Sequence, residues 1–161
     1  MTRDGGTCML HVVDRSGDEP VVVFLHHLGG SSATWSRVAE HLSRNRCVAA
    51  DLRGFGESVA EHGCGYSMAE NADDVAQLIR RLDVRRYVLV GHFSPPVLEA
   101  AVVRPLARAR LLVLPRVGHL APREAPAELA SAIARSVASS DESLRSATER
   151  DIAKDAKRKA K

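Results

Sequence analysis

The sequence predicts a layered α/β domain, a three-layer sandwich in which helices cover both faces of a mostly parallel sheet. Short apolar runs rich in β-branched residues alternate along the chain with segments whose apolar positions recur at helical spacing. The run Val21–Leu25 is apolar at every position, as expected for a central parallel strand that is buried on both faces. The composition, 45% hydrophobic and 27% charged, is that of a globular protein, and it excludes a wholly disordered, collagen-like or coiled-coil chain.

The first half of the chain is expected to supply three strands and one helix. The strand-like segments are Met9–Val13, Val21–Leu25 and Cys47–Ala50. A cluster of turn-forming residues, Asp14–Pro20, separates the first two of these segments. A helix is predicted over Ser32–Leu42, because its apolar residues recur at helical spacing, at Trp35, Val38, Ala39 and Leu42.

The second half continues the alternation of helices and strands. Ser67 and Glu70 form a capping box, and the helix that they open has an apolar face of Ala72, Val75, Leu78, Ile79 and Leu82. The segments expected after it are a strand at Tyr87–Val90, a helix at Pro95–Val103, a strand at Leu111–Leu114 and a helix at Ala127–Val137. Right-handed crossovers would place the carboxyl ends of the strands, and any active site, at one edge of the sheet.

Charge is spread unevenly along the 161 residues, which carry a formal net charge of +3. All four lysines lie within the last eight residues, whereas residues 1–138 hold 16 Arg against 15 Asp and Glu. We therefore predict one domain over residues 1–138 and a basic charged tail over residues 139–161. The near-neutral body argues against a face that binds nucleic acid. We interpret the tail as a solvated extension, and the alternative is an arm that binds phosphate groups.

Cysteine usage and hydropathy predict a soluble protein of the cytoplasm. The three cysteines, Cys8, Cys47 and Cys64, are odd in number and irregularly spaced, so we expect free thiols in a reducing compartment. The longest apolar run is too short to span a membrane, and the first residues lack the apolar segment of a secretory signal. We therefore expect no membrane partner.

Four motifs follow one another along the chain, at Val22–Trp35, Asp51–Ser58, Tyr66–His92 and Arg110–Pro126. Their order and their places after strands resemble the α/β-hydrolase superfamily, in particular its single-domain esterase, lactonase, epoxide-hydrolase and dehalogenase-like branches. The resemblance extends over residues 7–137. It implies hydrolysis of an ester, a lactone or a related bond in a small-molecule substrate, without a cofactor. We expect no metal site, because no two ligand pairs have the spacing of a tetrahedral centre.

The resemblance also implies roles for particular residues. His119 stands at the position of the catalytic base, and Leu28 at the position whose backbone N–H helps to bind the oxyanion. His26 matches the loop histidine of the family, while the next residue, His27, stands where the family usually has glycine. Asp51 belongs to a motif that shapes a neighbouring loop and is not normally catalytic.

The nucleophile elbow departs from the family pattern G-x-S-x-G. Counting from Gly91 places Phe93 at the nucleophile position, and shifting the pattern by one residue places Ser94 there. Ser94 is followed by Pro95, which has no N–H to serve as the second oxyanion donor. Losing one such donor typically costs about 100- to 1,000-fold in rate. We favour the interpretation of Ser94 as the N-cap of the helix that follows it, and the nucleophile is the alternative.

The triad acid is missing as well. Between Phe93 and His119 the only carboxylate is Glu99, inside a predicted helix, and Glu124 is close to His119 in sequence and makes a poor substitute. The chain looks like an incomplete α/β-hydrolase fold, shortened between the elbow and the last strand. We expect weak activity or none, with Ser94 as nucleophile, His119 as base and Leu28 as oxyanion donor if activity exists. The alternative is a non-catalytic pseudoenzyme or fragment that binds a ligand or a protein and self-associates through exposed sheet edges.

Overall fold

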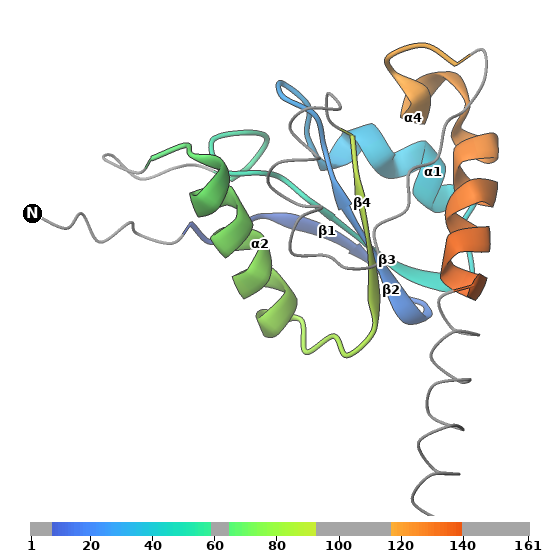
Figure 1. Cartoon of the computed structure of the whole chain (residues 1–161), viewed down its shortest axis with the longest axis horizontal. Coiled ribbons are helices and arrows are strands. Elements are labelled where there is room, and N and C mark those ends of the chain that lie inside the picture. The colour runs from blue at the N-terminus through green and yellow to red at the C-terminus, as the bar shows by residue number, and fades with distance from the viewer. Residues whose placement is uncertain (1–7, 59–64, 93–116, 140–161) are drawn as a thin grey trace, which may run out of the picture.

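A four-stranded sheet, in the order β1-β3-β2-β4, forms the centre of the computed structural model, which describes residues 8–58, 65–92 and 117–139 (Figure 1). Its strands are β1 (Val12–Arg15), β2 (Asp18–Leu25), β3 (Asn45–Ala50) and β4 (Tyr87–Gly91). Both β3 and β4 pair in parallel with β2, whereas β1 pairs antiparallel with β3. The prediction of a mostly parallel sheet is therefore confirmed.

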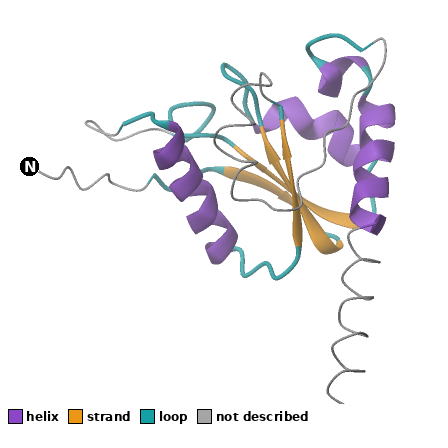
Figure 2. Ribbon diagram, viewed as in Figure 1, coloured by secondary structure: helices purple, strands orange, loops and turns teal. Residues whose placement is uncertain are grey.

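Helices cover both faces of the sheet, which confirms the three layers. The labelled helices are η1 (Ser32–Trp35), α1 (Ser36–Glu40), α2 (Met68–Arg81) and α4 (Ala121–Glu124), and a further helix spans residues 126–139. Figure 2 shows α2 on one side of the sheet, and α1 with the helix over residues 126–139 on the other. Within the described residues no helix is both long and apolar enough to cross a membrane.

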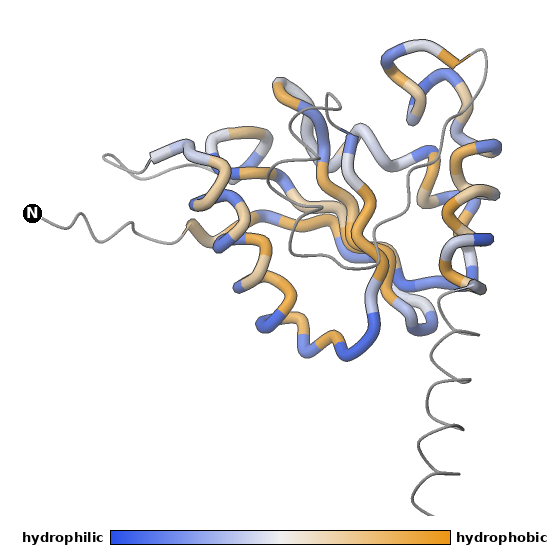
Figure 3. Tube along the Cα trace, viewed as in Figure 1, coloured by the Kyte–Doolittle hydropathy of each residue, from blue (hydrophilic) through white to orange (hydrophobic). Residues whose placement is uncertain are grey.

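The core has two sides because the side chains of β2 alternate between the faces of the sheet. Val22 and Phe24 pack in the cluster that contains Trp35 of η1 and Ile133 of the last helix. Leu25 packs in the cluster on the α2 side. All residues from 21 to 25 are buried, as the unbroken apolar run predicts, and the apolar band follows the sheet in Figure 3. The sheet is thus a rigid platform for the loops that leave its carboxyl edge.

The first strand and the turn after it differ from the prediction. The strand expected at Met9–Val13 is found at Val12–Arg15, because the antiparallel ladder with β3 begins at Val12. The turn expected at Asp14–Pro20 is correspondingly shorter, and only residues 16 and 17 lie between β1 and β2. Gly17 is needed at this turn, since a Cβ there would lie 2.4 Å from the backbone nitrogen of Arg46.

Helix α2 begins at the predicted capping box. The Ser67 hydroxyl accepts a hydrogen bond from the backbone N–H of Glu70, and the Glu70 carboxylate accepts one from the N–H of Ser67. Val75 and Leu78 are buried as expected, but Ala72 is exposed. A charged residue, Asp74, is buried beside Val75, because an arginine from another loop pairs with it.

The last predicted helix, Ala127–Val137, is confirmed and extends over residues 126–139. The helix predicted at Pro95–Val103 and the strand predicted at Leu111–Leu114 lie outside the described residues. The same holds for residues 140–161, so the division into a domain over 1–138 and a tail over 139–161 stays a prediction.

Candidate active site

The carboxyl ends of the three parallel strands lie at one level of the sheet. Leu25, the last residue of β2, is paired with Ala50 of β3 on one side and with Gly91 of β4 on the other. The backbone N–H of His92 continues this register, because it donates a hydrogen bond to the carbonyl of Leu25. The polar loops that follow the strands therefore meet at the edge where ligands bind in open α/β sheets.

His26 connects two of these loops and is fully buried. Its Nε2 accepts a hydrogen bond from the backbone N–H of Leu52 at 2.9 Å, and its Nδ1 donates to the carbonyl of His27 at 2.7 Å. Burial lowers the pKa of His26, and the hydrogen bond to His27 opposes that effect. Both ring nitrogens are thus occupied in the neutral imidazole, so His26 holds the loops together rather than reacting with a substrate.

A tight turn follows His26 and presents the amide of Leu28. The N–H of Gly30 donates to the carbonyl of His27, and Gly29 between them has φ of +81°, the conformation that glycine adopts most easily. The positive φ thus falls on Gly29, and His27 fits the turn although the family usually has glycine at its position. The N–H of Leu28 donates no hydrogen bond to any described residue. An oxyanion donor is expected to have such an unengaged amide.

Three histidines from three loops pack together at this edge. The ring centroids of His27 and His92 are 4.9 Å apart, and those of His92 and His119 are 5.2 Å apart. The Nε2 of His92 donates to the backbone carbonyl of His119 at 2.5 Å, which ties β4 to the loop before α4. Burial lowers the pKa of His92, and the two neighbouring histidines lower it further, against the hydrogen bond to His119. The cluster therefore favours a neutral His92.

Two buried polar atoms at this edge lack partners among the described residues. The Nδ1 of His92 is an acceptor, because Nε2 carries the proton, and the Nε1 of Trp35 is a donor. The two rings meet edge-on with centroids 6.4 Å apart. A buried donor and a buried acceptor without partners are costly, and a water or a ligand hydroxyl would satisfy them.

His119 lies in an exposed loop that the Glu124 carboxylate stabilises. The side chain of Glu124 accepts hydrogen bonds from the N–H of Gly118 at 2.8 Å and from the N–H of Leu120 at 3.2 Å. Glu124 therefore braces the loop on both sides of His119, and its oxygens are engaged with the backbone. Within residues 8–58, 65–92 and 117–139, no carboxylate is hydrogen-bonded to the His119 ring.

Asp51 shapes the loop after β3, as the motif implies. Its carboxylate accepts hydrogen bonds from the N–H groups of Ser32 and Glu57 and from the Nδ1 of His11. Burial raises the pKa of Asp51, but these hydrogen bonds outweigh burial and lower the pKa to about 2. Gly56 in the same loop has φ of +54°, and a Cβ there would collide with the Asp51 carboxylate. Asp51 is thus an ionised anchor for the loop and stands apart from the histidine cluster.

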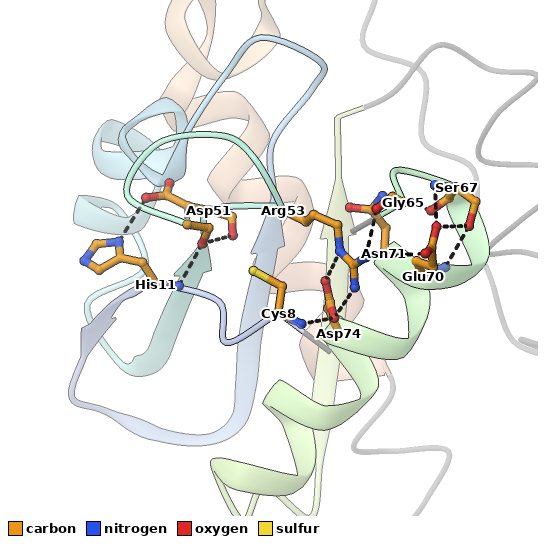
Figure 4. A network of polar contacts seen from close by, with 10 residues as sticks. Cys8, His11, Asp51, Arg53, Gly65, Ser67, Glu70, Asn71 and Asp74 are labelled. Carbon is orange, nitrogen blue, oxygen red and sulfur yellow. Dashed lines mark hydrogen bonds and ion pairs between the residues drawn. The ribbon is translucent and has the colours of Figure 1, made fainter. Parts of the chain in front are cut away.

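A buried ion pair fastens this loop to α2 (Figure 4). Arg53 donates through Nε and Nη2 to the two carboxylate oxygens of Asp74, both at 2.8 Å, and both side chains are 1% exposed. The Nη1 of Arg53 also donates to the carbonyl of Gly65, and the N–H of Cys8 donates to Asp74. The two parallel hydrogen bonds fix the orientation of the guanidinium, and the carboxylate balances its charge.

Sequence reasoning missed three residues of these networks. Asp74 could have been suspected as an acid next to buried positions of an amphipathic helix, but its partner Arg53 lies 21 residues away. His92 follows the elbow glycine, where only the nucleophile was sought. His11 carries no local signal, because its partner Asp51 is 40 residues distant.

Ser94 lies outside the described residues, as do Phe93, Pro95 and Glu99. The structure thus brings together the loops that carry Leu28, His26 and His119, and the nucleophile assignment stays a prediction. In the part of the chain that is described, no group of three or more His, Cys, Asp or Glu side chains is arranged to hold a metal ion.

Comparison with known proteins identifies the family. The family model of the alpha/beta hydrolase fold matches residues 20–92. Haloalkane dehalogenase 2 of Mycobacterium bovis is 31% identical over 117 residues, which cover 69% of this chain and 39% of that protein. The RutD protein of Serratia proteamaculans is 35% identical over 98 residues, which cover 59% of this chain and 37% of that protein. A solved esterase from a marine microorganism shares the fold, with a TM-score of 0.50 and 22% identity over 53% of this chain and 33% of its own.

Residues 20–92 define an α/β-hydrolase fold, and through them the chain belongs to the α/β-hydrolase superfamily. The resemblance drawn from the sequence motifs is thereby confirmed. The chain spans only 23% to 39% of the length of curated relatives that it matches. The sheet of four described strands is accordingly a partial hydrolase fold.

Proposed function

We propose that the carboxyl edge of the sheet is a hydrolase site for a small ester, lactone or related substrate, with weak turnover or none in this chain. The observation that carries the proposal is the convergence of the Leu28 turn and the His119 loop on His92. In this scheme the substrate carbonyl accepts from the Leu28 N–H, Ser94 attacks the carbonyl carbon, and His119 takes the serine proton. No cofactor is required.

Two features support weak turnover. The second oxyanion donor would come from residue 95, and proline has no N–H to donate. In addition, the carboxylate of Glu124 is engaged by the backbone of the His119 loop, so it is not available to orient the imidazole. Each deficit alone is expected to lower the rate by orders of magnitude, roughly 100- to 1,000-fold for the missing donor.

The same features favour a second candidate function, a non-catalytic member that binds a small ligand or a protein. The unpartnered Nδ1 of His92 and Nε1 of Trp35 offer one acceptor and one donor to a bound hydroxyl. This function needs the platform of loops but no nucleophile. It also allows self-association through a sheet edge.

Fluorophosphonate labelling of the folded protein, with peptide mass spectrometry to locate the adduct, distinguishes the two functions. The hydrolase proposal predicts an adduct on Ser94 that is lost in His119→Ala and retained in His41→Ala, a matched exposed histidine at the end of α1. An adduct that persists in His119→Ala, or none on folded protein, would refute the serine mechanism and favour the non-catalytic function.

A further inference from the structure

A cavity of about 430 Å³ lies on the α1 side of the sheet, between β1, β3 and η1. Its volume is within the range of small-molecule sites, roughly 300–1,000 Å³. Its apolar lining comprises Val13 and Ala33, which are exposed, and five buried residues, Phe24, Trp35, Ala39, Cys47 and Ala49. None of the three histidines of the proposed hydrolase site lines it. The cavity shares Trp35 with that edge of the sheet but contains none of the residues proposed for hydrolysis.

One end of the cavity holds a histidine in a fixed orientation. The N–H of His11 donates to the Ser58 hydroxyl at 2.8 Å, and the His11 carbonyl accepts from the N–H of Asp51 at 3.0 Å. The Nδ1 of His11 lies 2.9 Å from the Asp51 carboxylate, as Figure 4 shows. A carboxylate on one ring nitrogen orients a histidine and leaves the other nitrogen available. In the neutral ring the proton is on Nδ1, so Nε2 is an acceptor, 3.6 Å from Glu57.

The negative charges that line the cavity are concentrated near His11, and Arg15 lies away from them. Asp51 and Glu57 flank His11 at one end, and Glu40 is a third carboxylate in the wall. Arg15, which also lines the cavity, lies opposite Cys47 in the β1–β3 ladder. It is four residues from His11, so an extended chain places the two residues about 13 Å apart. The end at His11 is therefore acidic in a chain whose net charge is +3.

We propose that this cavity binds a small organic amine with an apolar body. The ammonium group donates to the Nε2 of His11 and to the carboxylate of Glu57, and the apolar body packs against Val13 and Ala33, the exposed apolar residues of the lining. An ammonium has three donors and no acceptor, which matches an end that offers one imidazole nitrogen and a carboxylate. An anionic molecule of the same size would meet two carboxylates there.

Benzylamine and benzoate are matched probes, because they share a ring and differ in charge. Trp35 is the only tryptophan of the chain, so its fluorescence reports on the cavity, and calorimetry gives a second readout. We expect saturable binding of benzylamine and about tenfold weaker binding of benzoate. Glu57→Gln should weaken benzylamine binding about three- to fivefold, since Glu57 is exposed and its charge is screened. Glu128→Gln removes an exposed carboxylate from the helix over residues 126–139 and should change nothing.

Ala33→Leu provides a variant that narrows the cavity without touching the core, because Ala33 is exposed on η1 and lines the cavity. It should weaken both probes while the thermal unfolding midpoint stays unchanged. Equal affinity for benzoate and benzylamine would overturn the proposal, as would unchanged binding in Glu57→Gln. Absence of both a fluorescence change and a binding heat would overturn it too.

Discussion

Replacing Asp74 by asparagine should destabilise the protein severely, because it removes the counter-charge of a buried arginine. Arg53 and Asp74 are each 1% exposed and share two hydrogen bonds of 2.8 Å. Removing one partner of such a pair typically costs about 3–5 kcal/mol. The carboxylate of Glu70 lies 3.6 Å from the Nη1 of Arg53 and compensates in part, so we expect about 3 kcal/mol. Natural domains have roughly 5–15 kcal/mol in all, so this loss is large.

Urea unfolding followed by the fluorescence of the buried Trp35 measures this cost. The matched control is Asp14→Asn, which breaks a partly exposed pair with Arg46 and should cost about 0–1 kcal/mol. The double variant Arg53→Met with Asp74→Leu should recover part of the stability, because no unpaired charge is left in the interior, although the hydrogen bonds to the Gly65 carbonyl and from the Cys8 N–H are lost. The reasoning is refuted if Asp74→Asn costs no more than Asp14→Asn, or if the double variant is as unstable as the single one.

Three further predictions concern pH and the start of α2. The pKa of Asp51 falls from 3.8 to about 2 on folding, so the ionised carboxylate adds at most about 2 kcal/mol of stability above pH 4, and this stability is lost as the pH falls towards 2. Urea titrations of Asp51→Asn should lack this loss of stability at acid pH. An identical loss in the variant and the parent protein would contradict the prediction. Because folding lowers the pKa of His26, stability should also fall as the pH drops below about 6.5, and His26→Gln should flatten that slope in urea titrations. Ser67→Ala should cost about 1 kcal/mol by removing the N-cap of α2, whereas exposed Ser36→Ala, outside that cap, should cost less in the same assay.

The elements that local pattern predicts are those that the structure confirms. The unbroken apolar run at Val21–Leu25 became the central strand, and the capping box at Ser67 became the start of α2. Elements that need a distant partner were less well predicted. The first strand begins at Val12 rather than Met9 because the ladder with β3 decides where it starts. Asp74 is buried although it is charged, because a partner 21 residues away in sequence neutralises it.

The candidate site divides in the same way. The order of the motifs indicated which loops carry Leu28, His26 and His119, and the sheet register brings those loops to one edge. The interactions within the site were not predictable, because a histidine has the same local sequence signal whether it binds a substrate, a carbonyl or another histidine. Thus His26 proved to be fully hydrogen-bonded, and His92 proved to hold the backbone of His119.

The sequence by itself determined the α/β class, the parallel central strand and the family, because periodicity, capping and motif order are written in neighbouring residues. Only the tertiary structure decided the pairing of Arg53 with Asp74 and the orientation of His11 by Asp51. It also placed Glu124 on the backbone of the His119 loop and not on its ring. These features depend on which polar atoms face each other after the chain has closed, and a buried polar group takes whichever partner the packed fold brings within hydrogen-bond distance.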